Sequence, residues 1–383
     1  MREGWTLKKL GEVAQSELGK TLNSAKDKGI CYPYLCAINV LWDKIDTTTL
    51  KETKFEDSEL ERYSVKKGDL LVCEGGDIGR AAIWDKEQPI LYQNALHRLR
   101  FHDALLPRFC LLYLRCLKEK GILDGRYGKG VTIKHLVKSS LLSIPIPVPP
   151  LSEQQRIVSE LDLLSSIIEK KKAQLKEYDQ LAQSIFYDMF GDPVTNEKGW
   201  EVKKLGEVCE ITSSLIDPQT FPYSVMFHVS PSNIISGTGE IIDCLLAKEE
   251  VLISNKYTFT KDMVLYSKIR PNLNKVATPN FDGICSADMY PLTIKPIANK
   301  VFIRNLLLGK HFLSYAIKHS GRARMPKINR EALFAYNFPL PPLSLQQSFA
   351  SKIEAIEHQK ALVQQSIAET ESLFNSRMDY YFD

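Results

Sequence analysis

The segment Pro149-Pro-Leu-Ser-Glu-Gln-Gln155 returns 192 positions later as Pro341-Pro-Leu-Ser-Leu-Gln-Gln347, and 192 is close to half of the 383 residues. In each copy, Ser-x-x-Gln directly follows two prolines. This spacing is that of a capping box, in which a serine side chain caps the first turn of a helix and a glutamine returns the hydrogen bond. We therefore expect one helix to begin at Ser152 and another at Ser344.

Two further segments repeat in the same order. Gly4-Trp-Thr-Leu-Lys-Lys-Leu-Gly-Glu-Val13 matches Gly199-Trp-Glu-Val-Lys-Lys-Leu-Gly-Glu-Val208, and Phe186-Tyr-Asp-Met-Phe190 matches Met378-Asp-Tyr-Tyr-Phe382. This period is far longer than the roughly 20–50 residues of a solenoid repeat. The pattern predicts one large unit written twice, whereas length alone suggests between two and three domains.

A long helix is expected behind each proline segment. Apolar residues recur there at the a and d positions of about five heptads, and Gly191-Asp-Pro193 ends the first run. A helix of ~40 residues is about 60 Å long and cannot bury such a seam alone, so we expect the two helices to form an antiparallel coiled coil. The alternative is that each helix lies on its own domain. The expected seam residues are Leu161, Leu164, Ile168, Leu175, Ile185, Ile353, Ile356, Val363, Ile367 and Phe374.

The remainder of each copy has the mixed pattern of strands and helices that is typical of an α/β (α+β) domain. Short β-branched and aromatic runs lie between glycine-rich and aspartate-rich turns, and a helical pattern follows them. We expect globular domains at residues 1–148 and 193–340, and coiled-coil helices at 149–192 and 341–383. In the first domain, strands are expected at 70–73, 81–84, 90–92 and 96–101 and a helix at 107–120; in the second, strands at 263–266 and 275–277 and a helix at 300–319.

Composition excludes several classes of protein. The 50 basic and 46 acidic residues give a net charge of +4, and the 8 cysteines include no C-x-x-C pair, so a zinc site is not indicated. The sequence shows neither the apolar core of a signal peptide nor a run of about 18 apolar residues, so we expect a soluble, cytoplasmic protein.

Basic residues are concentrated before each proline segment. Between Asp288 and Glu331 there are nine lysines and arginines and no acidic residue. Flexible loops that combine Arg or Lys with Thr and Asn suit phosphate contacts and the reading of base edges, so we expect DNA contacts there. The alternative is an ordinary solvated basic face. The candidate residues are Arg126, Lys129, Thr132, Lys134 and His135 in the first copy, and Arg322, Arg324, Lys327, Asn329 and Arg330 in the second.

A second pair of basic turns follows a matching strand in each copy. These turns are Gly76-Asp-Ile-Gly-Arg80 and Lys268-Ile-Arg-Pro-Asn-Leu-Asn-Lys275. Each turn taken alone is only a weak indication of DNA binding. They add Arg80, Lys268, Arg270, Asn274 and Lys275 to the candidate DNA-binding residues.

Catalytic motifs are largely absent. Ala14-Gln-Ser-Glu-Leu-Gly-Lys-Thr21 resembles a Walker A loop without its first glycine, but no suitable strand ending in Asp follows it. We find no Asn/Asp-Pro-Pro-Tyr/Phe segment of amino-methyltransferases, no G-x-S-x-G and no H-E-x-x-H. The alternative of a stand-alone nucleotide- or S-adenosylmethionine-dependent DNA enzyme is therefore disfavoured.

The repeated openings, the Pro-Pro-Leu-Ser-x-Gln-Gln segments, the paired helices and the Phe-Tyr-Asp-Met-Phe-Gly-Asp-Pro193 exit resemble the specificity (S) subunit of type I restriction–modification systems. The resemblance covers essentially the whole chain. It implies two target recognition domains, each reading one half of a bipartite site in double-stranded DNA, and a coiled coil that sets the spacer between the half-sites.

The same resemblance implies the partners. The coiled coil would dock two methyltransferase (M) subunits, and restriction (R) subunits would join the complex. It implies no catalytic residue and no cofactor on this chain, since S-adenosylmethionine is expected on the M subunits and ATP and Mg²⁺ on the R subunits. A coiled-coil scaffold that never touches DNA is the remaining alternative.

Overall fold

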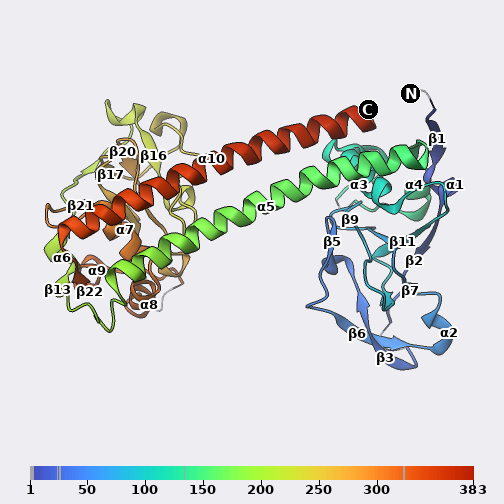
Figure 1. The fold of residues 1–383 in the computed structure, drawn as a ribbon, viewed down its shortest axis with the longest axis horizontal. Coiled ribbons are helices and arrows are strands. Elements are labelled where there is room, and N and C mark those ends of the chain that lie inside the picture. The colour runs from blue at the N-terminus through green and yellow to red at the C-terminus, as the bar shows by residue number, and fades with distance from the viewer. Residues whose placement is uncertain (1–3, 24, 26, 133, 322–323) are drawn as a thin grey trace. The chain divides into compact units, whose positions relative to one another are not determined.

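The computed structural model describes residues 4–23, 25, 27–132, 134–321 and 324–383. The chain divides into two compact units (Figure 1). The first comprises Met1–Lys170 and Ile367–Asp383, and the second comprises Lys171–Ser366. Each unit therefore contains one globular part and a piece of both long helices, α5 (Leu151–Phe190) and α10 (Leu343–Phe382).

The described residues of the first unit form two four-stranded sheets and two shorter ribbons. The sheets have the orders β2-β11-β8-β9 and β6-β3-β10-β7, and the ribbons are β1-β12 and β4-β5. The strands are β1 (Thr6–Lys9), β2 (Ala14–Leu18), β3 (Ile30–Leu35), β4 (Val40–Leu41), β5 (Lys44–Ile45), β6 (Lys51–Phe55), β7 (Ser64–Val65), β8 (Leu70–Cys73), β9 (Ala81–Ile83), β10 (Ile90–Tyr92), β11 (Leu96–Phe101) and β12 (Pro145–Val148). The helices of its globular part are α1 (Leu10–Val13), η1 (Ala37–Asn39), α2 (Asp57–Leu60), α3 (Pro107–Glu119), η2 (Leu123–Tyr127) and α4 (Lys138–Leu142).

The second unit repeats this plan. Its four-stranded sheets are β14-β21-β18-β19 and β15-β17-β20-β16, and its ribbon is β13-β22. The strands are β13 (Glu201–Lys204), β14 (Cys209–Glu210), β15 (Leu215–Ile216), β16 (Phe227–Val229), β17 (Lys256–Phe259), β18 (Val264–Ser267), β19 (Val276–Ala277), β20 (Gly283–Cys285), β21 (Met289–Ile294) and β22 (Asn337–Leu340). The helices are α6 (Leu205–Val208), η3 (Tyr223–Val225), η4 (Pro231–Asn233), η5 (Ala247–Glu249), η6 (Pro271–Leu273), α7 (Lys300–Leu308), α8 (Lys310–Lys318) and α9 (Arg330–Phe334). The predicted duplication of a mixed α/β unit is confirmed.

Most of the predicted strands are present. Those at 70–73, 90–92 and 96–101 are β8, β10 and β11. Strands β9 and β19 are each one residue shorter than predicted, and β18 is shifted by one residue toward the C-terminus. Buried hydrophobic side chains line β8 along its whole length, as expected for a strand covered on both faces.

The single helix predicted at 300–319 is wrong. Two helices, α7 and α8, are separated by Gly309, which has extended φ and ψ values of −65° and 149°. Glycine is the poorest helix former after proline, so one residue of this type interrupts an otherwise helical pattern.

The long helices begin one residue before the predicted starts at Ser152 and Ser344, so the predicted capping boxes are wrong. They start at Leu151 and Leu343, so Ser152 and Ser344 already lie inside the first turn. The adjacent glutamines, Gln154 and Gln346, are completely buried instead.

These glutamines bind the start of each long helix to its globular part. The side-chain oxygen of Gln154 accepts a hydrogen bond from the backbone N–H of Leu106 at 2.8 Å, just before α3. In the second unit, Gln346 accepts from the N–H of Asn299 at 2.8 Å, just before α7. The first glutamine of each repeated Gln-Gln pair therefore has a structural role, which is to join the start of the long helix to the globular part.

Pieces of α5 and α10 run antiparallel in both units. In the first, the Tyr381 hydroxyl donates to Glu160 at 2.6 Å, and Arg377 forms an ion pair with the same carboxylate. In the second, the Lys360 ammonium lies 2.8 Å from Asp179. This pairing is the one that the heptads predict, and it contradicts the alternative that each helix lies separately on its own domain. Among the predicted seam residues, Leu161, Ile168, Ile353, Ile356, Ile367 and Phe374 are buried, and Leu164, Leu175, Ile185 and Val363 are half-buried.

None of the helices that the described residues form is both long and apolar enough to cross a membrane.

Candidate nucleic-acid interface

In each unit two loops predicted separately lie against each other. We call residues 74–80 and 268–275 the strand-end loops, and residues 125–136 and 320–330 the basic loops. In the first unit, the N–H of Leu136 donates to the carbonyl of Glu74 at 2.7 Å. In the second unit, the N–H of Ile328 donates to the carbonyl of Lys268 at 3.0 Å. The fold therefore brings the two candidate segments of each copy together.

The surrounding sheet holds this junction in the same way in both units. The N–H of Glu74 donates to Ala95, and that of Lys268 donates to Asp288, both at 3.0 Å. A side chain from the next strand of the sheet also contacts the basic loop, with His97 Nε2 2.7 Å from the carbonyl of Leu136.

Tyr290 takes the place of His97 in the second unit. Its hydroxyl donates to the carbonyl of Ile328 at 3.5 Å. His97 is completely buried, and burial lowers the pKa of its imidazole to about 4. The imidazole is therefore neutral near pH 7, and Nε2 carries the hydrogen that the carbonyl accepts.

The tip of the first basic loop is open to solvent. The backbones of Lys129 and His135 exchange two hydrogen bonds of 2.8 Å, which close the loop at its base. Between them, Val131 and Thr132 are exposed and Lys134 is half-buried. Arg126 is exposed and lies over the ring of Tyr127 at 5.6 Å. All five predicted residues of this loop thus lie on one short segment.

The second basic loop also presents cations. Arg324, Lys327 and Arg330 are exposed. Asn329 is exposed too, but its side-chain oxygen accepts from the N–H of Ala332 at 2.8 Å and caps α9. Arg322 lies outside the described residues.

Two members of the second strand-end loop face the same region. Arg270 is exposed, has a left-handed φ of 47°, and its N–H donates to the carbonyl of Pro326 at 2.7 Å. Lys268 is half-buried, with its ammonium 5.5 Å from the centre of the Tyr290 ring. Each residue thus lies next to the basic loop.

Three other predicted residues serve internal contacts. Arg80 donates to the carbonyl of Ala37 at 2.7 Å, Asn274 to that of Leu308 at 2.8 Å, and Lys275 to that of Pro231 at 2.6 Å. Their polar groups stabilise turns, so we omit all three from the interface proposed below.

The Walker-like segment has a structural role. Its lysine, Lys20, is buried, and the ammonium lies 2.6 Å from Glu59 and donates to the carbonyl of Lys54 at 2.8 Å. The residues before it form strand β2. Among the described residues, no group of three or more His, Cys, Asp or Glu is arranged to hold a metal ion.

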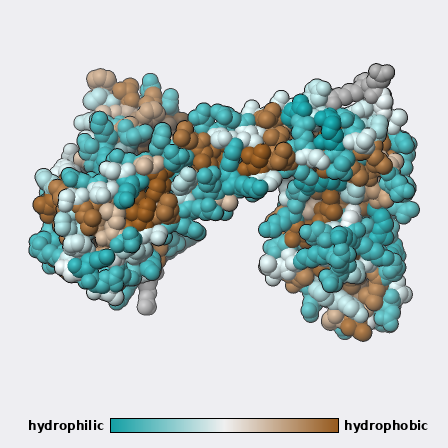
Figure 2. Space-filling model, in the orientation of Figure 1, coloured by the Kyte–Doolittle hydropathy of each residue, from teal (hydrophilic) through white to brown (hydrophobic). Residues whose placement is uncertain are grey.

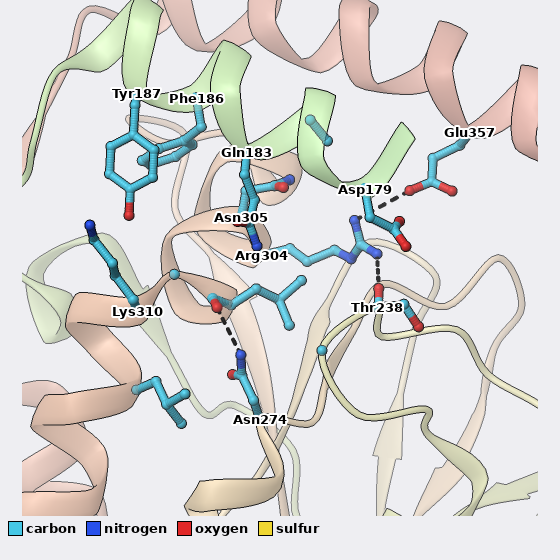
Figure 3. A pocket seen from close by; sticks show the side chains of 15 residues that line it. Asp179, Gln183, Phe186, Tyr187, Thr238, Asn274, Arg304, Asn305, Lys310 and Glu357 are labelled. Atoms are coloured by element: carbon cyan, nitrogen blue, oxygen red, sulfur yellow. Dashed lines mark hydrogen bonds and ion pairs between the residues drawn. The ribbon is translucent and has the colours of Figure 1, made fainter. Parts of the chain in front are cut away.

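A cavity of about 360 Å³ in the second unit lies beside α5, α7 and α8 (Figure 3). Arg304 crosses it, donates to the carbonyl of Thr238 and lies 3.7 Å from Glu357 of α10. Burial lowers the pKa of this guanidinium. The charge of Arg304 holds the loop at Thr238 against the long helix α10. We therefore do not assign a ligand to this cavity.

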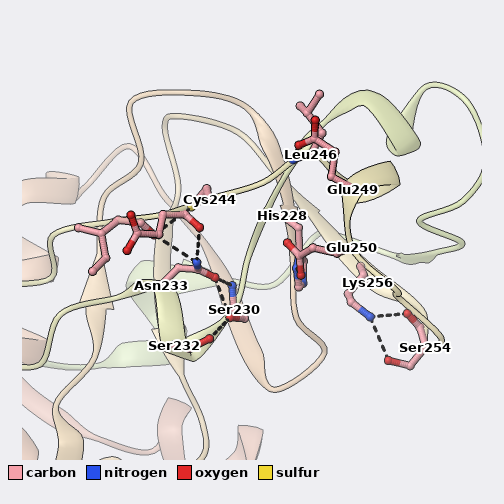
Figure 4. Close-up of polar contacts among 12 residues, drawn as sticks. His228, Ser230, Ser232, Asn233, Cys244, Leu246, Glu249, Glu250, Ser254 and Lys256 are labelled. Carbon is pink, nitrogen blue, oxygen red and sulfur yellow. Dashed lines mark hydrogen bonds and ion pairs between the residues drawn. The ribbon is translucent and has the colours of Figure 1, made fainter. Parts of the chain in front are cut away.

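A second polar cluster is equally self-contained (Figure 4). His228 is buried and lies 3.1 Å from Glu250, and burial lowers the pKa of its imidazole. The nearby Lys256 is also buried and donates to the hydroxyl of Ser254 at 3.0 Å. These contacts join the loops around β16 and β17.

Glu74 lies at the junction of the two loops of the first unit but is not among the residues that the sequence predicts there. The predicted DNA contacts are basic or neutral polar side chains and include no carboxylate, although Glu74 stands where the second copy has Lys268, immediately after the matching strand. Alignment of the two copies on β8 and β18 is the signal that identifies this position.

Comparison with known proteins places the whole chain. The family model for the type I restriction modification DNA specificity domain matches residues 2–177 and again residues 197–372. The EcoDI specificity subunit of Escherichia coli is 26% identical over 389 residues, covering 92% of this chain and 81% of the relative. The putative MjaX specificity subunit of Methanocaldococcus jannaschii is 25% identical, with 93% and 87% covered.

Solved structures share the fold. The crystal structure of a type I restriction-modification S subunit from M. genitalium has a TM-score of 0.56 and 14% identity, with 98% of this chain and 95% of that chain covered. A chain from work on the complex assembly and conformational transition of the type I R-M system has a TM-score of 0.61 and 18% identity, covering 100% and 98%. With the family model matching twice, this chain belongs to the type I restriction–modification DNA specificity family, as a specificity subunit and not a catalytic one.

Proposed function

We propose that the two globular domains, at residues 1–148 and 193–340, each read one half of a bipartite target in double-stranded DNA. The observation that carries this proposal is the junction of a strand-end loop with an exposed basic loop, formed by the same backbone hydrogen bonds in both units. A solvated basic face would not require the same loop pairing in two domains of such different sequence.

The exposed side chains suit the two tasks of a DNA reader. Lysines and arginines contact phosphates and provide affinity that falls as salt is added. Exposed polar side chains beside the junction would contact base edges in the major groove. The proposed contacts are Arg126, Lys129, Thr132, Lys134 and His135 in the first domain, and Lys268, Arg270, Arg324, Lys327 and Arg330 in the second.

The helices at 149–192 and 341–383 are proposed to set the spacer and to dock two methyltransferase subunits. Several large apolar side chains of these helices are exposed, although the seam is buried. They are Leu163 and Leu181 on α5, and Leu362 and Leu373 on α10. Patches of hydrophobic residues are visible over the long helical segment in the surface view (Figure 2). Exposed apolar residues beside charged ones suit a protein partner.

The partner subunits would supply the chemistry. S-adenosylmethionine would bind the methyltransferase subunits, and ATP and Mg²⁺ the restriction subunits. This chain would contribute the choice of DNA sequence and the geometry of assembly.

Exchange of one domain tests the proposal. Residues 4–145 would be replaced by the corresponding part of another specificity subunit, and the complex with the methyltransferase partner expressed in cells. Methylome sequencing should then show a change in one half-site only. A change in both half-sites, or in neither, would contradict the assignment of one half-site to each domain. Binding of ATP or S-adenosylmethionine by the isolated chain would favour the rival reading of a stand-alone enzyme.

A further inference from the structure

Glu74 and Lys268 occupy the same place in the two units. Each directly follows the matching strand, β8 or β18, and each donates its N–H to the carbonyl before the neighbouring strand, at 3.0 Å. Each also accepts, through its own carbonyl, the hydrogen bond that anchors the basic loop. The backbone is therefore the same at a position where the side chains have opposite charge.

The carboxylate of Glu74 has no hydrogen bond or ion pair with any residue that the structure describes. It is half-buried, and burial raises its pKa, although His135 beside it acts in the opposite direction. The other acidic side chain of this loop behaves differently, since Asp77 lies 2.8 Å from the ammonium of Lys118. An unpaired, partly desolvated carboxylate is costly, so a partner outside the chain would account for it.

That partner is not a phosphate, because two negative charges repel. The major groove offers exocyclic amino groups, and carboxylates accept hydrogen bonds from N4 of cytosine there. Lysine has the opposite preference and donates to O6 and N7 of guanine. We propose that Glu74 and Lys268 are specificity-determining residues that read a cytosine and a guanine, respectively, at corresponding positions of the two half-sites.

This proposal rests on the proposed function, because it assumes that the junction of the two loops faces DNA. It goes beyond that function by assigning to one position, which is Glu74 in the first unit and Lys268 in the second, a different base in each half-site. Tyr290 supports the lysine side of the proposal, since its ring holds the Lys268 ammonium at 5.5 Å and limits the positions that the ammonium can take.

The test uses the full chain assembled with its methyltransferase partner. The methylated motif of the parent is first mapped, and the mapping is repeated for Glu74→Gln, Glu74→Lys and Lys268→Glu. Glu74→Lys should shift the preference at one position of the first domain's half-site from cytosine to guanine, by about tenfold or more. Lys268→Glu should cause the reciprocal change in the other half-site only.

Glu74→Gln keeps the size of the side chain and one acceptor oxygen, so it should reduce discrimination at the same position without abolishing assembly. It therefore carries the test if Glu74→Lys fails to fold, as judged from the thermal midpoint. The matched control is Glu52→Gln, an equal change of charge at an exposed position of β6 in the same unit.

Two results would overturn the proposal. One is an unchanged motif in folded Glu74 variants. The other is a uniform loss of methylation at all sites with base preferences intact, which would make Glu74 a structural residue. Neither result contradicts the proposed function if domain exchange still alters one half-site, so the two ideas fail separately.

Discussion

The ring of Phe382 packs edge-on against that of Phe109, with centroids 5.3 Å apart. The last turn of α10 is thereby attached to α3 within the first unit. Phe190 makes the same contact with Phe302 in the second unit, at 4.9 Å. The repeated aromatic segments that end both long helices thus have one task, which is to bind a helix end to a globular domain.

Phe382→Ala should destabilise the first unit by about 1–3 kcal/mol, because it removes a half-buried aromatic group and leaves space against Phe109. The measurement is chemical denaturation followed by a probe in each unit. The matched control is Tyr380→Ala, since this ring on the same helical turn is 59% exposed. Equal losses for both variants would show that the aromatic contact is unimportant.

The ion pair of Lys360 and Asp179 gives a prediction for the helix seam of the second unit. The Lys360 ammonium is largely buried and lies 2.8 Å from Asp179 and 3.3 Å from Glu357; these carboxylates raise its pKa against the opposing effect of burial. Asp179→Asn should cost about 1 kcal/mol, because Glu357 still compensates part of the charge.

The control for this prediction is Asp188→Asn, which removes a carboxylate from an exposed position of the same helix. The free energy of unfolding of the two variants should differ. A smaller effect at Asp179 than at Asp188 would mean that the seam does not depend on this ion pair.

His97 predicts a specific pH dependence. Burial lowers its pKa to about 4 in the folded chain, whereas an unfolded histidine titrates near 6.5. The unfolded state therefore binds the extra proton first as the pH falls. The free energy of unfolding is therefore unaffected by His97 protonation above pH ~6.5. It decreases as the pH falls towards 4, by about 3 kcal/mol at most.

Replacement of His97 by glutamine should remove this part of the acid sensitivity while keeping a donor for the carbonyl of Leu136. Unfolding free energies at several pH values between 4 and 7 give the comparison. The parent and the variant should converge as the pH is lowered. Parallel curves over this interval would contradict a buried neutral imidazole.

Arg324→Ala and Lys327→Ala should weaken binding to DNA across sequences without changing the motif. Each lost phosphate contact lowers the slope of log K against log salt by about 0.9. Titrations at two or more salt concentrations with the assembled complex measure this slope. Lys248→Ala, at an exposed position of η5 in the same unit, is the control. A slope that changes equally in all three variants would count against the basic loop.

The sequence predicted repeated architecture better than individual side-chain roles. Repeats and heptads depend on many residues at once, so an error at one position does not change the result. They predict α5 and α10 correctly, although the predicted capping boxes at Ser152 and Ser344 are wrong. The roles of Arg80, Asn274 and Lys275 could not be predicted in this way. Each side chain bonds to a backbone carbonyl more than 30 positions away in the chain, and only the folded loops create that contact. The role proposed for Glu74 could not be predicted for a related reason, since its position beside the basic loop depends on the pairing of β8 with β11.

The paired helices α5 and α10 are expected to set the spacer between the two half-sites. Lys171 donates to the hydroxyl of Ser366 at 2.7 Å, which identifies facing positions of α5 and α10. Seven residues inserted after Lys170 and seven inserted after Ser366 would therefore add one heptad to both helices and keep all existing pairs in register. If the helices set the distance between the half-sites, about 10 Å of added helix should lengthen the unread spacer by about three base pairs. Methylome sequencing would show the two half-sites unchanged and farther apart. Insertion into α5 alone breaks the register and should abolish methylation, which makes it the matched control. An altered half-site, or an unchanged spacer with the double insertion, would refute the role of the helices as a ruler.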